Sequence, residues 1–414
     1  MPEINRRTFV SAGIGAVAAG LGTHVAWAQA AMQTPVKIGV LGDFSASYAN
    51  ISGKPMVEAV KMAVEDFGGQ LLGKPIEIVS ANSELKPDIA SGIARNWWDN
   101  ENVDVITDLP GSAMALAVIG LAAPRKKIVF ATSAVSSEIS GKSCTPYTVQ
   151  WNYDTYSVAH SIGPAILDKG GRDWFFISLD TITGASVQKE ISDVVVAKGG
   201  KVLGAVRAPT GTMDFSSFLL QAQASNAQVI CFSVAGHDGI TLTKQAAEYG
   251  LIGADSDPEK KIMITGCFTQ PDDIRSVGLQ SAQGLLYASA FDWNLDDETR
   301  GFSKRFFARA DVMPNQNMAA TYSSMLHYLN AVKAIGSKDA DAVMAQMRAT
   351  EVNDVFAKNG ELRIDGRMAH GGYVMQAKGP KDSTGPWDIA TALAYVPANV
   401  AVRPLSAGGC PLVK

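Results

Sequence analysis

Few residues in this sequence have the types and the spacing that catalysis or metal binding requires. Beyond residue 28 the histidines are His160, His237, His327 and His370, and none is spaced for metal binding with another histidine or a cysteine. The sequence also has neither a nucleophile elbow nor a helix with paired histidines, which are signatures of common hydrolases. These patterns predict no metal site, no catalytic residues and no enzyme activity.

One glycine-rich segment, residues 68–75 (GGQLLGKP), has the glycine spacing and lysine of a phosphate-binding loop. It ends in Pro75, where Ser or Thr would have to bind magnesium, and it follows a predicted helix rather than a strand. We therefore interpret the segment as a helix C-cap and turn, and we expect no nucleotide or other cofactor.

Two clusters remain as candidates for binding. His237 and Asp238 follow a predicted strand, where a catalytic pair, a hydrogen-bonding site for a ligand and a solvated loop are the alternatives. Adjacent residues at a strand end rarely act together in catalysis, so ligand binding is favoured. Residues 151–157 (WNYDTYS) lie between two predicted domains and form either a packed linker or, the favoured reading, the lining of a cleft.

The amino-acid composition and net charge limit the kinds of molecule that this protein can bind. The 414 residues are 47% hydrophobic and 18% charged, which is typical of a folded protein with about two to three domains. The formal net charge of -4 excludes the broad basic surface that nucleic acid or an anionic membrane would require. We expect a small-molecule ligand and no nucleic acid.

The first 28 residues resemble a signal peptide rather than a core helix. Arg6 and Arg7 precede a short Gly/Ala-rich apolar stretch, and Ala26 and Ala28 fit the small-residue rule for cleavage. Paired arginines before a weakly hydrophobic stretch predict the twin-arginine route and a periplasmic protein. No later apolar run is long enough to predict a membrane span.

Four cysteines allow three disulfide connectivities. Cys231 and Cys267 lie in or next to apolar runs that predict buried strands, whereas Cys144 and Cys410 lie in loops rich in Gly, Ser and Pro. We expect Cys144 to pair with Cys410, fastening the C-terminal tail, and the other two to remain small buried thiols.

Strands and helices alternate along the chain, which predicts parallel sheets covered on both faces. In the first unit we expect strands at 36–41, 76–80, 103–107 and 127–131 and helices at 55–67, 87–100 and 112–123. In the second we expect strands at 174–179, 201–206, 229–234 and 261–265 and helices at 186–198, 215–224 and 240–249. A strand at 285–290 and helices at 299–310, 318–335 and 339–350 follow, and these helices could cover the first sheet.

Ligands of open parallel sheets bind beyond the carboxyl ends of the strands. The loops at those ends are rich in Ser, Thr, Gly, Asp and aromatic residues, which can hydrogen-bond to a small solute and stack on it. They are residues 42–53, 108–112, 132–141, 180–185, 235–239 and 266–272.

The ordered pieces resemble the periplasmic solute-binding proteins of branched-chain amino acid type ABC transporters, which have the type I periplasmic binding fold. The resemblance spans the chain after the signal peptide. The segments that carry it are VKIGVLGD (36–43), SSE (136–138), WNYDT (151–155), DFSSFLLQAQA (214–224) and KQAAEYG (244–250), together with the surroundings of Cys144 and Cys410.

The resemblance implies two α/β lobes joined by a three-strand hinge. The N-terminal lobe would be residues 36–150 plus about 291–362, and the C-terminal lobe about 156–286 plus about 368–414. A solute would bind between the lobes, and the closed form would be recognised by an ABC permease in the inner membrane.

Carried over to this sequence, the resemblance implies a first-lobe serine, a loop whose backbone amides hold a ligand carboxylate, and tyrosines that wall the cleft. These are Ser112, then Ser133, Ala134 and Val135, then Tyr48, Tyr153 and Tyr156. From the second lobe we add Asp180, Thr181, His237, Asp238 and Phe268.

Two departures from the family pattern concern the ligand. Gly266-Cys267-Phe268 stands where amino-acid binders have a glutamate for the ligand ammonium, and the loop 180–184 lacks a common Tyr-Gly pair. Asp238, or less readily Asp180, could replace the acid. Loss of the acid and gain of Phe268 favour an aromatic or other carboxylate without an amine over an amino acid, an amide, urea or a polyol.

A second class of function would have the same cleft, because a periplasmic ligand-binding module can also report to a membrane sensor or regulator. An enzyme on this scaffold would need a base, a nucleophile or a metal that the sequence does not offer.

Overall fold

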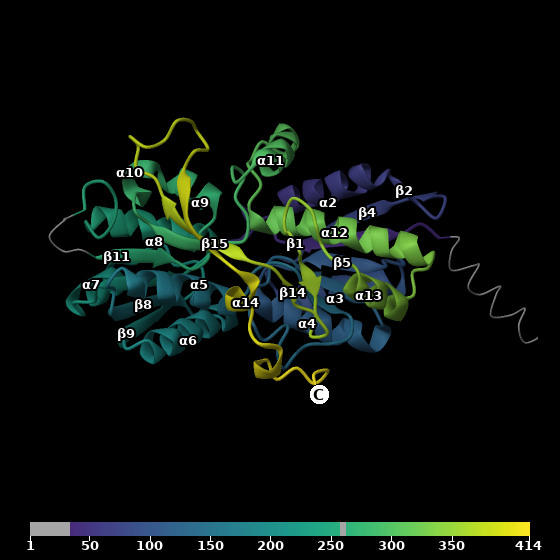
Figure 1. Ribbon diagram of the computed structural model, residues 1–414, viewed down its shortest axis with the longest axis horizontal. Coiled ribbons are helices and arrows are strands. Elements are labelled where there is room, and N and C mark those ends of the chain that lie inside the picture. Colours follow the sequence, from purple (N-terminus) through teal and green to yellow (C-terminus); the bar gives the residue numbers. More distant parts are fainter. Residues whose placement is uncertain (1–33, 257–261) are drawn as a thin grey trace, which may run out of the picture.

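The computed structural model describes residues 34–256 and 262–414, so the predicted signal peptide lies outside the described residues. Two large sheets stand side by side in Figure 1. The first has the strand order β4-β1-β5-β6-β7, and all its neighbouring strands are parallel. Its strands are β1 (Lys37–Gly42), β4 (Glu77–Asn82), β5 (Val105–Asp108), β6 (Ile128–Ala131) and β7 (Thr148–Gln150).

Helices cover both faces of this sheet. Successive side chains of a strand point to opposite faces, and here both sets of side chains are apolar and buried. Ile38 belongs to the apolar core shared with α2 (Lys54–Phe67) and α12 (Gln316–Ile335). Leu41 belongs to the core shared with α3 (Pro87–Asp99) and α4 (Ser112–Ala122). The late helices α12 and α13 (Ala340–Ala349) therefore do return to cover the first sheet, as expected.

The second sheet has the strand order β16-β15-β12-β11-β10-β8-β9. Five strands are parallel: β8 (Asp173–Leu179), β9 (Lys201–Ala208), β10 (Val229–Ser233), β11 (Met263–Gly266) and β12 (Leu286–Ser289). The last two, β15 (Gly372–Ala377) and β16 (Ala390–Val396), are antiparallel. The strands β15 and β16 are joined without a crossover helix, so they pair antiparallel. The sequence did not predict these two strands, and they extend the expected parallel sheet with an antiparallel edge.

Helices α5 (Thr155–Asp168), α6 (Ile182–Ala197), α7 (Ser216–Ala224) and α8 (Gly236–Glu248) belong to the second half. Both α6 and α8 begin four residues before the start that we expected, because their first turns carry Thr, Gly and His rather than an apolar stripe. His237 and Asp238 consequently lie in the first turn of α8, not in a loop. Helix α5 was not predicted from the sequence, because it contains Pro164 and is apolar on most sides.

The glycine-rich segment after α2 ends a helix and then turns back. Gly68 closes α2 in the left-handed conformation, at φ 111°. Strand β2 (Gln70–Leu71) then pairs antiparallel with β3 (Lys74–Pro75). This confirms the helix C-cap and turn.

Three connections run between the two sheets. They link β7 to α5, β12 to α11 (Asp297–Ala310), and β14 (Met368–Ala369) to β15. Arg367 is 1% exposed and holds the first and third connections together, because its Nε lies 3.2 Å from Asp154 Oδ2 and its guanidinium donates to the Gln150 carbonyl. The lobe limits given above stay a prediction, and the three connections are compatible with them.

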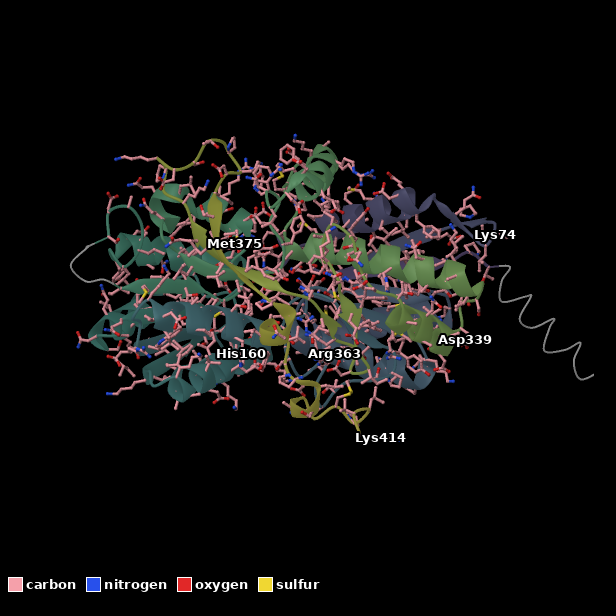
Figure 2. The ribbon with its side chains drawn as sticks, in the orientation of Figure 1. Lys74, His160, Asp339, Arg363, Met375 and Lys414 are labelled. Carbon is pink, nitrogen blue, oxygen red and sulfur yellow. A yellow bond between two sulfur atoms is a disulfide. The ribbon has the colours of Figure 1, made fainter. Side chains whose placement is uncertain are left out.

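The C-terminal segment is fastened to the first half. Cys144 and Cys410 form a disulfide, which confirms the pairing expected from the sequence. Arg363, near the middle of Figure 2, also donates to the carbonyl of Arg403 at 2.8 Å. Cys231 and Cys267 are buried free thiols, with their Sγ atoms 3.3 Å apart.

Replacing one cysteine of this disulfide should release the tail. The bond spans 266 residues, so the unfolded chain gains conformational entropy when it is lost. We expect Cys410→Ala to lower the free energy of unfolding by about 2–5 kcal/mol in denaturant titration. The double variant Cys144→Ala/Cys410→Ala is the matched control and should be no less stable than the single one. A disulfide without a stabilising role would leave all three proteins equal.

Candidate functional site

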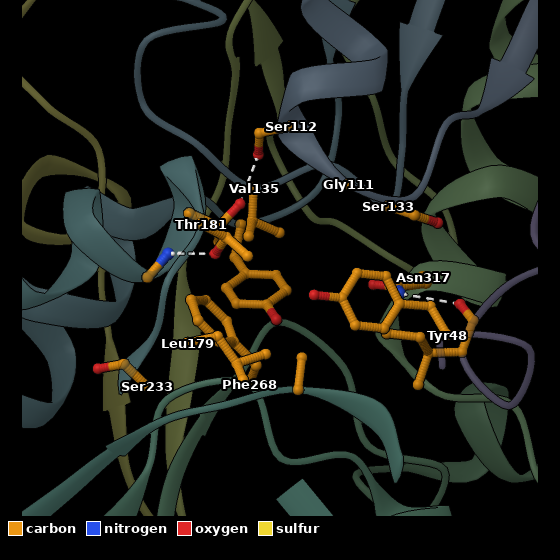
Figure 3. Close-up of a pocket in the computed structure, with 15 residues that line it drawn as sticks. Tyr48, Gly111, Ser112, Ser133, Val135, Leu179, Thr181, Ser233, Phe268 and Asn317 are labelled. Carbon is orange, nitrogen blue, oxygen red and sulfur yellow. Dashed lines mark hydrogen bonds between the residues drawn. The ribbon is translucent and has the colours of Figure 1, made fainter. Parts of the chain in front are cut away.

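A pocket lies between the two sheets, where the carboxyl ends of their parallel strands face each other (Figure 3). Its empty space, counted together with the open solvent at its mouth, is about 470 Å³, of which about 30 Å³ is open to the centre of a water-sized group. Its lining residues end or follow β1, β5, β6 and β7 of the first sheet and β8, β10 and β11 of the second, except for Asn317 from α12. A ligand in this pocket would therefore contact both halves of the protein at once.

The structure brings seven of the twelve predicted ligand-binding residues into the lining. Two are serines, three are aromatic, and the others are a valine and a threonine. They are Ser112, Ser133, Tyr48, Tyr153, Phe268, Val135 and Thr181.

Two aspartates that could have held a ligand amine are not among the residues of the lining. Asp180 has an exposed side chain and lies 3.7 Å from Arg207. Asp238 is 3% exposed, and its carboxylate accepts a hydrogen bond from the Gly211 amide at 2.9 Å. Each acid is thus engaged with a group of the protein itself.

The three other predicted residues lie close to the pocket without lining it. The amide of His237 donates to the Ser47 carbonyl at 3.2 Å. The ring of Tyr156 stacks on His160. Ala134 is buried, and its carbonyl accepts from Gln150 Nε2 at 3.4 Å.

Eight lining residues were not named individually from the sequence. Five of them belong to the loops expected at the strand ends, so the rule that ligands bind beyond the carboxyl ends of parallel strands does predict their region. They are Ile51, Gly111, Thr183, Gly184 and Ala235. Leu179 and Ser233 belong to the predicted strands themselves. Asn317 comes from α12, far along the chain, and no local signal in the sequence indicates it.

Tyr48 is placed by a buried carboxylate. Asp43, fully buried after β1, accepts hydrogen bonds from the amides of Ser45, Ala46 and Tyr48 at 2.7–3.0 Å, which winds the loop around it. Burial, together with the nearby carboxylates of Asp238 and Asp43, raises the pKa of Tyr48 to about 12. Its hydroxyl is therefore neutral and can donate a hydrogen bond.

A second buried carboxylate, Asp108, supports the neighbouring loops. It accepts hydrogen bonds from the hydroxyls of Ser133 and Ser52, each at 2.6 Å, and from the Gly53 amide at 3.2 Å. Burial raises its pKa to about 7. Asp108 thus ties the loop after β6 to the loop after β1.

The N-termini of two helices meet at the pocket. Helix α4 begins at Ser112 and α6 at Ile182, and Ser112 Oγ lies 2.8 Å from Thr183 Oγ1 across the cleft. The first amides of a helix have no carbonyl partner within the helix, and the helix dipole is positive at this end. The two helix starts therefore create a favourable place for an anion.

The rest of the lining is neutral. No charged side chain is present among the lining residues, all of which belong to the described chain. Tyr48, Tyr153 and Phe268 supply aromatic surface. Asn317 is fixed by Asn152, whose Nδ2 donates to its Oδ1 at 2.7 Å, and by its own hydrogen bond to the Ile51 carbonyl.

Two carboxyl groups of the second half bind neutral groups of the first half beside the pocket. Asn50 Nδ2 donates to Asp273 Oδ1 at 2.8 Å, and the Ser137 hydroxyl donates to Glu190. Burial raises the pKa of both carboxyl groups to about 7. These contacts join the two halves directly.

Comparison with known proteins identifies the family. Residues 35–385 match the periplasmic binding protein family, and the chain belongs to it. A periplasmic binding protein of Burkholderia mallei is 41% identical, with a TM-score of 0.87, over 92% of this chain and 99% of that one. A branched-chain amino acid ABC transporter periplasmic ligand-binding protein of Burkholderia xenovorans is 40% identical, with a TM-score of 0.82, over 92% and 100%.

A more distant structure shares the fold. It is an ABC transporter solute-binding protein of R. palustris in complex with benzoate, 18% identical, with a TM-score of 0.80 over 91% of this chain and 100% of that one. The match to the family model and the two structures of about 40% identity confirm the predicted family and the two-lobed α/β fold. The family consists of solute-binding proteins of ABC transporters, not of enzymes.

The buried Glu190 should make stability fall as pH rises. Its folded-state pKa of about 7 exceeds the ordinary value near 4.5, so the folded protein binds more protons between these pH values. Its stabilising contribution is complete below about pH 4.5 and is lost by pH 8. We expect Glu190→Gln to match the wild type at pH 5 and to be about 1–3 kcal/mol more stable at pH 8.

Thermal unfolding across this pH range measures the difference. The exposed Glu248→Gln variant is the control and should track the wild type at every pH. An equal effect of Glu190→Gln on stability at pH 5 and pH 8 would contradict the raised pKa of Glu190.

Proposed function

We propose that this protein is the solute-binding receptor of an ABC importer and that its solute is a small carboxylate without an amine, preferably aromatic. The observation that carries the proposal is the pocket at the meeting of two helix N-termini, where the lining is neutral and aromatic. Such a lining favours an anion and offers an ammonium group no carboxylate partner.

The carboxylate would lie near the starts of α4 and α6. There the first-turn amides can donate hydrogen bonds to it, together with whichever hydroxyl of the Ser112–Thr183 pair accepts, rather than donates, the hydrogen bond between them. The ring would stack between Tyr48, Tyr153 and Phe268. The benzoate-bound neighbour is an example of this fold holding an aromatic carboxylate.

Capture would proceed by closure of the two halves. Because the lining comes from both sheets, a solute makes its full set of contacts only when the halves are together. Binding then shifts the population towards the closed form, which an inner-membrane permease would recognise. Membership of the family implies a periplasmic location. Export by the twin-arginine route remains a prediction from residues 1–28.

None of the helices in residues 34–256 and 262–414 is long and apolar enough to cross a bilayer.

A panel of solutes tests the ligand class. We expect benzoate or another amine-free carboxylate to raise the unfolding temperature, with about 2.7 kcal/mol of stabilisation at 100 times its dissociation constant, and leucine and phenylalanine to have no effect. In titration calorimetry Asp238→Asn should keep the affinity for the carboxylate within about tenfold, or roughly 1.4 kcal/mol, because Asp238 would not contact it.

Stabilisation by amino acids alone, or a hundredfold loss of affinity in Asp238→Asn, would instead make Asp238 the partner of a ligand amine. Stabilisation by none of the solutes would contradict the proposed ligand class.

A further inference from the structure

A second cavity lies directly behind the ligand pocket. Its empty space, counted together with open solvent, is about 260 Å³, of which only about 10 Å³ is open to the centre of a water-sized group. It is bounded by α5, by the end of β12, by the link between β14 and β15, and by α14 (Ala398–Ala401). Tyr153 lines both cavities. The side chain of this one residue therefore stands between them.

The second cavity is lined mostly by small residues. Ala288, Ala290 and Ala401 contribute methyl groups, and Ser157 and Ser161 contribute hydroxymethyl groups from α5. Small side chains leave room that larger neighbours would fill in a close-packed interior. The small size of these side chains thus accounts for the space.

Among the described residues that line this cavity, His370 is the one titratable side chain other than Tyr153. Its Nδ1 lies 2.7 Å from the Gly371 carbonyl, which identifies Nδ1 as the protonated nitrogen and Nε2 as an acceptor. Nε2 is buried and has no hydrogen-bond partner among the described residues. Burial lowers the pKa of His370 to about 3, so the ring is neutral and the lining carries no charge.

Tyr153 is held firmly where it stands. It lies in the connection between β7 and α5, it is 5% exposed, and its amide donates to Asn152 Oδ1 at 2.8 Å. The cavity behind it also contacts the other two connections between the sheets, through Ala290 and His370. An occupant of that cavity would therefore lie against all three connections.

We propose that Tyr153 is the specificity residue that limits the length of the solute, and that removing its ring would let an uncharged extension of a longer carboxylate reach the space behind it. The inference rests on the proposed function, because it takes the carboxylate to be anchored at the starts of α4 and α6. With Tyr153 in place the pocket accepts one ring and its carboxylate. Without the phenol ring the two cavities become one.

The test compares benzoate with 3-phenylpropanoate, which has the same ring and carboxylate and two more carbons, by titration calorimetry of the full protein. The wild type should bind benzoate at least tenfold more tightly. Tyr153→Ala should change the ratio of the two dissociation constants by at least tenfold in favour of 3-phenylpropanoate. Tyr48→Ala is the matched control, since Tyr48 lines the first pocket only; it should weaken both ligands and leave their ratio within about threefold.

A filling variant provides a second readout. Tyr153→Ala/Ser161→Met places a longer side chain in the second cavity and should return the ratio towards the wild-type value. If Tyr153→Ala does not fold, Tyr153→Leu is judged by the same ratio.

The outcomes separate the two proposals. If neither carboxylate binds the wild type, the proposed function fails and the length limit fails with it. If benzoate binds but Tyr153→Ala leaves the ratio unchanged, or Tyr48→Ala shifts it equally, only the assignment of Tyr153 is overturned.

Discussion

Everything at the pocket depends on one consequence of parallel strand order: each strand ends, and the following helix begins, at the same edge of the sheet. Two such sheets facing each other bring the starts of α4 and α6 together, with Ser112 and Thr183 in contact. Unpaired amides and aligned helix dipoles then converge without any charged side chain. The chain can thus favour an anion while the lining stays neutral and aromatic.

Buried polar groups keep this edge rigid. Asp43 winds the loop that carries Tyr48, and Asp108 links Ser133 to the loop after β1. Arg367, fully buried, holds two of the three connections between the sheets. Each of these charges would be costly in an apolar interior without its hydrogen bonds, so the loops around them have few alternative conformations.

The sequence predicts most of the architecture because strands with apolar runs and amphipathic helices produce strong periodic signals. It also predicts the pocket edge and the pairing of Cys144 with Cys410. It does not predict α5, whose Pro164 and all-round apolar character hide the period, or the antiparallel edge strand β16, which is exposed on most of its length. Asn317 could not be found because its place in the pocket depends on how α12 packs on α2, not on its neighbours in sequence.

The central claim is that the carboxylate of the solute binds at the starts of α4 and α6. A crystal structure of the protein with benzoate tests it most directly. The account predicts carboxylate oxygens within hydrogen-bond distance of the first-turn amides of α4 or α6 and a ring against Tyr48, Tyr153 or Phe268. A benzoate bound elsewhere, or turned with its carboxylate away from both helix starts, would contradict the account.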